Sequence, residues 1–174
     1  MSSRTTRSRQ AHGTDADLLA IYLNDHLLGA TVGVERARYL AEECTDPEVT
    51  KSLEPIAKEI AEDRKSLVGI MRRLDISVRR YKVYAGRLAE RVGRLKSNGS
   101  LVRRSPLTTM VELEFLRLGV EGKAAVWQTL RELTDAEERL DGQQLNVLTD
   151  RATRQLSTLE ELRRRQARKV FTDD

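Results

Sequence analysis

The stretch that decides the fold is DLLAIYLNDHLLGATVGVERARYL, residues 17–40. Its apolar residues recur at the three- and four-residue spacing of an amphipathic helix, yet Asn24, Asp25 and His26 interrupt the apolar run. Because successive helical residues turn by about 100°, these three side chains cannot all face the interior. We expect Asn24 to face away from the core, and His26 to be a hydrogen-bonded residue at its inner edge rather than a metal ligand.

Composition and length place the chain among all-α proteins with a single domain. The 174 residues include only 4% aromatic residues, and no window shows the alternation that marks a half-buried β-strand. No apolar run approaches the roughly 20 residues needed to span a bilayer, and the opening MSSRTTRSRQ lacks the apolar core of a signal peptide. We therefore expect a soluble cytoplasmic protein without a membrane span.

Cap and proline signals divide the chain into four long helices. The predicted helices begin at Thr14 or Asp15, at Pro47 after the cap Asp46, at Pro106 after the cap Ser105, and at a capping box of Asp135 with Glu138. They end near residues 43, 74, 133 and 170. The short loop within each pair makes each pair a helical hairpin.

The same signals predict the domain boundaries. Residues 1–14 have nothing to bury and are expected to form a disordered basic tail, and residues 172–174 form an acidic C-terminal end. Residues 15–171 are expected to fold as a single four-helix-bundle domain. Within it, residues 79–104 form a basic helical connector, so the predicted architecture has one long crossover between the second and third helices.

An internal repeat relates the two predicted hairpins. GVERARYL, residues 33–40, matches GVEGKAAVW, residues 119–127, which places Glu35 opposite Glu121 in the repeat. The dipeptides at residues 63–64 and 150–151, Asp-Arg in both cases, match at nearly the same separation. The sequence therefore predicts two related helical hairpins.

With this helix layout and the repeated Glu, residues 15–170 resemble the ferritin-like superfamily, in particular bacterial members that lack an intact di-metal ligand set. Di-metal members draw one Glu from each of two helices and a Glu-x-x-His pair from each of the others. Here Lys65 stands where the His should follow Glu62, and the fourth helix has no His. We expect no metal cofactor; the alternative is a protein that binds iron or manganese through Glu35, Glu62, Glu121 and Asp150.

Two arginines at repeat-equivalent positions suggest what fills the bundle centre instead. Glu35 with Arg64, and Glu121 with Arg151, are candidates for buried ion pairs, because the Arg guanidinium is well suited to a buried carboxylate partner. The alternative is that both arginines extend to solvent. Two further expectations concern packing: Trp127 is a core residue of the third helix, and the small residues Gly29 and Gly33 let the first helix approach a neighbour closely.

The connector at 79–104 is a candidate site for an anionic partner, because it carries nine basic residues and one acidic residue, a net charge of +8. Phosphates attract such a segment, and its tyrosines are able to stack on bases. The alternative is that it neutralises the acidic hairpins internally. The candidate residues are Arg79, Arg80, Tyr81, Lys82, Tyr84, Arg87, Arg91, Arg94, Lys96, Arg103 and Arg104.

No phosphate-binding glycine loop, nucleophile motif or metalloprotease motif is present, so enzyme activity is not expected. The sequence predicts a non-catalytic ferritin-like bundle that acts through contacts with a partner protein or with copies of itself as a homo-oligomer. One alternative is a di-metal carboxylate protein with an iron-handling or oxidase role. The other is a nucleic-acid-associated or ribosome-associated protein that uses the basic connector.

Overall fold

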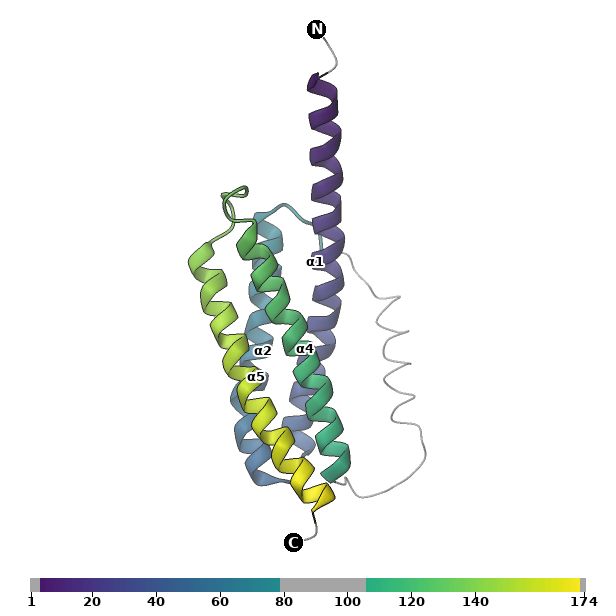
Figure 1. Cartoon of the computed structure of the whole chain (residues 1–174), viewed down its shortest axis with the longest axis vertical. Coiled ribbons are helices and arrows are strands. Elements are labelled where there is room, and N and C mark those ends of the chain that lie inside the picture. Colours follow the sequence, from purple (N-terminus) through teal and green to yellow (C-terminus); the bar gives the residue numbers. More distant parts are fainter. Residues whose placement is uncertain (1–3, 79–105, 173–174) are drawn as a thin grey trace.

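The computed structural model describes residues 4–78 and 106–172, and the side chains of the first range from residue 16 onward. These ranges are helical and contain no strand, which confirms the all-α prediction for the described chain. The helices, drawn in Figure 1, are α1 (Arg4–Glu43), α2 (Pro47–Arg73), α4 (Pro106–Glu132) and α5 (Gly142–Phe171). None of the described helices is long and apolar enough to cross a membrane.

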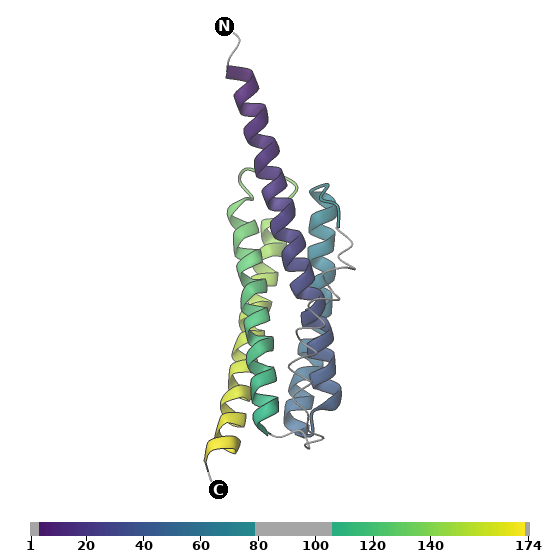
Figure 2. The same cartoon turned by 90° about the vertical axis from the view of Figure 1, so that its right-hand side faces the viewer.

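The four helices form two antiparallel hairpins, one of α1 with α2 and one of α4 with α5 (Figures 1 and 2). Each hairpin is tightly packed within itself, whereas the hairpins meet mainly along α1 and α4 and only slightly along α2 and α5. The helices therefore follow one another around the bundle in the order α1, α2, α5, α4. As a consequence, α2 and α4 face each other across a diagonal of the bundle.

The start of α2 agrees with its cap signal and is tied to the end of α5. The Asp46 carboxylate accepts a hydrogen bond from the backbone N–H of Glu48 at 3.1 Å, and Pro47 opens the helix. The same carboxylate accepts hydrogen bonds from Gln166, at 2.8 Å, and from Lys169. Although burial opposes ionisation, these hydrogen bonds lower the pKa of Asp46. The cap therefore joins the two hairpins at one end of the bundle.

Two predicted helix starts are wrong. α1 begins at Arg4, so the helix continues through the segment predicted as a disordered tail and projects beyond the other helices (Figures 1 and 2). Extending a formed helix adds one hydrogen bond for each residue ordered, which explains why a weak local sequence suffices. α5 begins at Gly142 with Asp141 as its cap, not at Asp135, because the buried Leu140 anchors a turn ahead of the helix.

The buried stripes of α2 and α5 share one spacing. Both follow the alternating three- and four-residue steps that keep one helix face turned inward. The stripes are Leu53, Ile56, Ile60, Asp63, Leu67 and Ile70 in α2, and Leu145, Leu148, Ala152, Gln155, Leu159 and Leu162 in α5. Asp63 thus occupies the structural place of Gln155 rather than that of Asp150, which corrects the register of the second half of the repeat.

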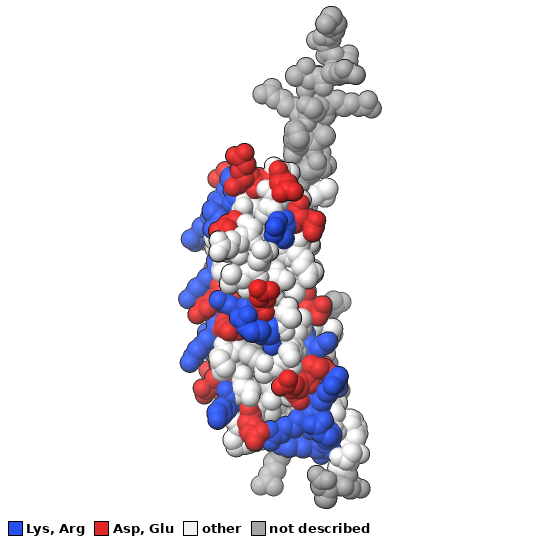
Figure 3. Space-filling model, turned by 60° about the vertical axis from the view of Figure 1, so that its left-hand side comes forward, with Lys and Arg blue, Asp and Glu red and all other residues white. Residues whose placement is uncertain are grey.

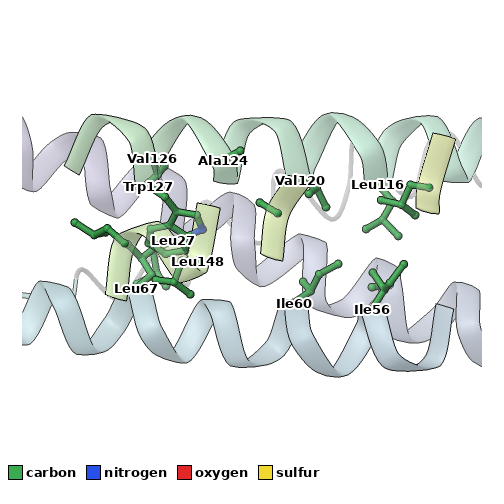
Figure 4. Close-up of a cluster of buried hydrophobic side chains, with 14 of the residues drawn as sticks. Leu27, Ile56, Ile60, Leu67, Leu116, Val120, Ala124, Val126, Trp127 and Leu148 are labelled. Carbon is green, nitrogen blue, oxygen red and sulfur yellow. The ribbon is translucent and has the colours of Figure 1, made fainter. Parts of the chain in front are cut away.

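Trp127 is the largest side chain of the core, with 1% of its surface exposed, which confirms the prediction. Figure 4 shows Trp127 gathered with Leu27, Leu67 and Leu148, which come from the other three helices. All four helices therefore meet around this one indole ring.

On the face that carries α5, positive and negative side chains are interspersed over the surface (Figure 3).

Candidate functional site

A cleft of about 980 Å³ lies along the seam where α1 meets α4. Its apolar lining is contributed chiefly by α4, and Leu67 and Ile60 of α2 form part of its floor. Leu107, Val111 and Phe115 of α4 line it while remaining exposed to solvent. A concave, largely apolar surface with a few polar groups is the usual form of a ligand-binding site.

Side chains join α1 to α4 toward both ends of this seam. The Tyr22 hydroxyl and the Thr129 hydroxyl lie 3.3 Å apart in a hydrogen bond beyond one end of the cleft. Toward the other end, Arg36 donates to the Glu112 carboxylate at 2.8 Å in an ion pair. The α1 segment between Tyr22 and Arg36 is about 21 Å long, given a rise of 1.5 Å per helical residue. This part of the cleft therefore lies between two fixed contacts, and the lining continues past Arg36 to Tyr39 and Leu107.

Four glycines keep the seam open between these contacts. Gly29 and Gly33 of α1 and Gly119 and Gly122 of α4 all line the cleft. A Cβ atom added at any of the four would meet nothing within 4 Å. The prediction that Gly29 and Gly33 allow a close helix approach is therefore wrong, because the space beside them is not filled by the neighbouring helix.

A buried ion pair crosses the bundle diagonal at the floor of the cleft. Asp63 of α2 is 1% exposed, and its Oδ2 atom lies 2.5 Å from Nζ of Lys123 on α4. Arg151 of α5 donates to the other carboxylate oxygen of Asp63 at 3.0 Å and to Glu62 at 3.2 Å. Burial lowers the pKa of Lys123, and the adjacent Asp63 carboxylate opposes that shift.

Gln155 completes this polar centre from α5. Its side-chain oxygen accepts a hydrogen bond from Lys123 at 2.5 Å, and its amide nitrogen donates to Glu59 at 2.8 Å. One buried carboxylate, two cations and an amide therefore occupy the bundle centre, and the carboxylates of Glu59 and Glu62 complete their hydrogen bonds. Buried charges persist only when they are paired and hydrogen-bonded in this way.

Arg64 lies one position beyond Asp63 and faces the cleft. Its Nε atom donates to the Thr31 hydroxyl of α1 at 2.9 Å, and the residue is partly buried. Among the described residues, Arg64 forms no ion pair, whereas the other two cations of the cleft lining, Arg36 and Lys123, each have a carboxylate partner. The cleft therefore carries one positive charge that the described chain does not neutralise.

The predicted ion pairs of Glu35 with Arg64 and of Glu121 with Arg151 are not formed in the described chain. Glu35 and Glu121 are both exposed, while Arg64 bonds to Thr31 and Arg151 to Asp63 and Glu62. The prediction of a carboxylate–arginine contact in the bundle interior holds for Arg151, but its buried partner is Asp63. A shift of one helical position turns a side chain by about 100°, which is sufficient to exchange one partner for another.

The four residues of the alternative metal set lie at the surface, and one of them, Glu62, contacts Arg151 of the polar centre. Glu35, Glu62, Glu121 and Asp150 are all exposed. Within residues 4–78 and 106–172, no group of three or more His, Cys, Asp or Glu side chains is arranged to hold a metal ion. Lys123 and Arg151 surround Asp63 at the bundle centre.

The three polar residues within the apolar run of α1, Asn24, Asp25 and His26, are arranged differently from the prediction. Asn24 is 1% exposed and donates to the backbone oxygens of Ala20, at 2.8 Å, and Ser77, at 3.1 Å. It therefore fixes the segment after α2 against α1, whereas Asp25 is the exposed member of the three. The His26 ring lines the cleft and meets the Tyr22 ring edge-on at 4.5 Å between centroids. Burial lowers the pKa of His26, against the opposing effect of Asp25.

Sequence reasoning missed Lys123 and Gln155 as members of the polar centre. Their positions along the helices could have indicated burial. Gln155 lies within an apolar stripe at core spacing, and Lys123 stands between the buried Val120 and Val126. Polar residues at core positions require partners, so each of them marks a buried contact. All the basic-connector candidates, from Arg79 to Arg104, fall outside the described residues.

A second cavity, of about 540 Å³, lies where α2 begins and α5 ends. Its charged side chains are paired with one another, Arg165 with Glu48 and Lys169 with Asp46. The α1–α4 cleft is therefore the stronger candidate, because it combines the larger volume with an apolar lining and a cation that lacks a carboxylate partner among the described residues.

These features define the class of the protein as an all-α bundle of two helical hairpins with a ligand-sized cleft along their seam. Neither the protein-family models nor the curated proteins nor the solved structures contain a match to the chain.

Proposed function

We propose that the protein is a non-catalytic helical bundle of the ferritin-like type that acts by binding a partner in the α1–α4 cleft. The observation that carries the proposal is the glycine-lined gap between fixed contacts, since Gly33 and Gly119 leave space that no described side chain fills. The polar centre supports a non-catalytic role, because Lys123 and Arg151 satisfy Asp63 where reactive groups or ligands would otherwise face one another. A bacterial origin and a cytoplasmic location belong to the same proposal.

The test fills the cleft and measures binding of a neutral apolar dye, N-phenyl-1-naphthylamine. Gly33→Leu and Gly119→Leu place side chains in the open space and also raise helix propensity, so we expect folded proteins that have lost dye binding. Gly69→Leu on α2 is the matched control, because a Cβ there also meets nothing within 4 Å but the residue lies outside the cleft lining. Equal dye binding by the two cleft variants and wild type would overturn the proposal.

Sedimentation of the same samples addresses self-association. An oligomer that Gly33→Leu and Gly119→Leu dissociate, while Gly69→Leu leaves it intact, would support the proposal with a second copy as the partner. Metal analysis of protein purified without chelator addresses the di-metal alternative. Stoichiometric iron or manganese that is lost in Glu35→Ala would favour that alternative and contradict a non-catalytic bundle.

A further inference from the structure

The chemistry of the cleft specifies its occupant more closely, and this inference rests on the proposed function. A ligand must match a long apolar lining and one cation, because Arg64 forms no ion pair among the described residues. A buried or half-buried cation next to an apolar surface is most strongly stabilised by an anion that arrives with apolar groups attached. An aliphatic carboxylate supplies both.

A second polar group of the cleft lacks a hydrogen-bond partner among the described residues. The indole N–H of Trp127 lies in the cleft wall, is buried, and meets no acceptor among the described residues. A buried donor without an acceptor costs free energy. Two polar groups of the cleft, Arg64 and Trp127, therefore have hydrogen-bonding capacity that the described chain does not use.

Two contacts between α1 and α4 restrict the shape of the occupant. Tyr22 with Thr129, and Arg36 with Glu112, connect α1 to α4 on either side of the glycines. A partner helix with a diameter of about 10 Å would have to break these contacts to lie along the seam, whereas a single aliphatic chain would not. The geometry therefore favours a small molecule over a protein segment.

We propose that the cleft binds a medium-chain aliphatic carboxylate, with its carboxylate on the Arg64 guanidinium and its chain extended along the glycines toward Leu67 and Trp127. Leu67 follows Arg64 by one helical turn on the same side of α2, so a chain anchored at Arg64 continues over it. Thr31 holds the guanidinium through Nε and leaves its two terminal nitrogens to bind the two carboxylate oxygens.

The test compares sodium decanoate with 1-decanol, two probes that share an aliphatic chain and differ in charge. Trp127 is the only tryptophan of the chain and lines the cleft, so its emission reports binding directly. We expect decanoate to bind about tenfold or more tightly than decanol, since a hydrogen bond to an ionised group is roughly twice as strong as a neutral one. Arg64→Met should reduce the affinity for decanoate to that for decanol.

Arg72→Met is the matched control, because Arg72 is an exposed arginine of α2 outside the cleft lining, and it should retain the preference for decanoate. Arg64→Gln replaces the methionine variant if circular dichroism shows that variant to be unfolded. Decanol binding without any preference for decanoate, or a preference that survives both Arg64 variants, would overturn the carboxylate assignment alone. If neither probe alters Trp127 emission, the carboxylate assignment fails, and the dye experiment above decides separately whether the cleft is a binding site.

Discussion

Nζ of Lys123 lies 2.5 Å from Oδ2 of Asp63, and this contact joins α4 to α2 across the diagonal of the bundle. The ion pair is therefore a direct polar connection between the two hairpins through the core. The Asp63 carboxylate is fully buried, and the Lys123 side chain is only 12% exposed. Removing Asp63 would leave the buried Lys123 ammonium without this carboxylate partner.

Asp63→Ala should lower the free energy of unfolding by about 3 to 5 kcal/mol, because Lys123 and Arg151 would lose the carboxylate that compensates their burial. Urea denaturation measures this change. Asp150→Ala is the control, because Asp150 also precedes an arginine in the sequence but is exposed. This substitution should change the free energy of unfolding by no more than about 0.5 kcal/mol. A similar loss in both variants would contradict the assignment of Asp63 to a buried network.

The same network predicts the effect of replacing it as a whole. A combined Asp63→Leu, Lys123→Met and Gln155→Leu variant should be far more stable than Asp63→Ala, because removing Asp63 and Lys123 together leaves neither charge without its partner. Arg151 retains Glu62 as a partner in that variant. A combined variant less stable than Asp63→Ala would contradict this prediction and would mean that the buried polar contacts themselves stabilise the fold.

Trp127→Ala should destabilise the protein by about 3 to 5 kcal/mol, since it removes the largest core side chain at the point where all four helices meet. Trp127→Phe should cost less, because most of the apolar contact remains. Thermal or urea unfolding measures both. The native emission spectrum gives an independent check, because the indole is buried, and the spectrum of a solvent-exposed tryptophan would contradict its placement.

The free energy of unfolding should decrease as the pH falls below 6.5, the ordinary pKa of His26. Burial lowers the pKa of His26 in the folded protein, so between the two values the unfolded chain binds the proton more readily, and protonation favours unfolding. Stability measured from pH 8 to pH 5 in wild type and His26→Gln should show a smaller decrease in the variant. Identical profiles would assign the pH dependence to other groups.

Binding of nucleic acid by residues 79–104 stays a prediction, and its salt dependence is the sharpest test. If the basic connector contacts phosphates, the logarithm of affinity should fall linearly with the logarithm of salt concentration, by about 0.7 to 0.9 per contact. Reversal of Arg87, Arg91 and Arg94 to Glu should abolish binding without loss of helical content. An internal neutralising role instead predicts that the triple variant unfolds and that wild type binds no RNA or DNA even in low salt.

Helix layout was predictable because it depends on local signals. Asp46 with Pro47 placed the start of α2 correctly, and Pro106 placed the start of α4, since a cap and a proline act within one turn of the chain. The capping box at Asp135 failed because a competing contact, burial of Leu140, is tertiary and has no local signature. The start of α1 failed because helix extension depends on the packed segment that follows it.

The candidate site was only partly predictable, because it depends on which helix face meets which neighbour. The repeat aligned Asp63 with Asp150, yet the structure buries the first and exposes the second. Sequence alone places a side chain on a helix face only within about one position, or 100°, and partner choice in the core requires better precision than that. The cleft itself could not be predicted from Gly29 and Gly33, since small residues suit a close approach and an open gap equally well.

The uneven packing between hairpins sets the order in which the molecule loses structure. α1 with α2, and α4 with α5, are closely packed, while a cleft interrupts the packing between α1 and α4. Opening free energies within one native protein track the local density of buried contacts. The bundle is thus two stable halves with a weaker seam between them, and whatever fills that seam strengthens the cooperativity of the whole fold.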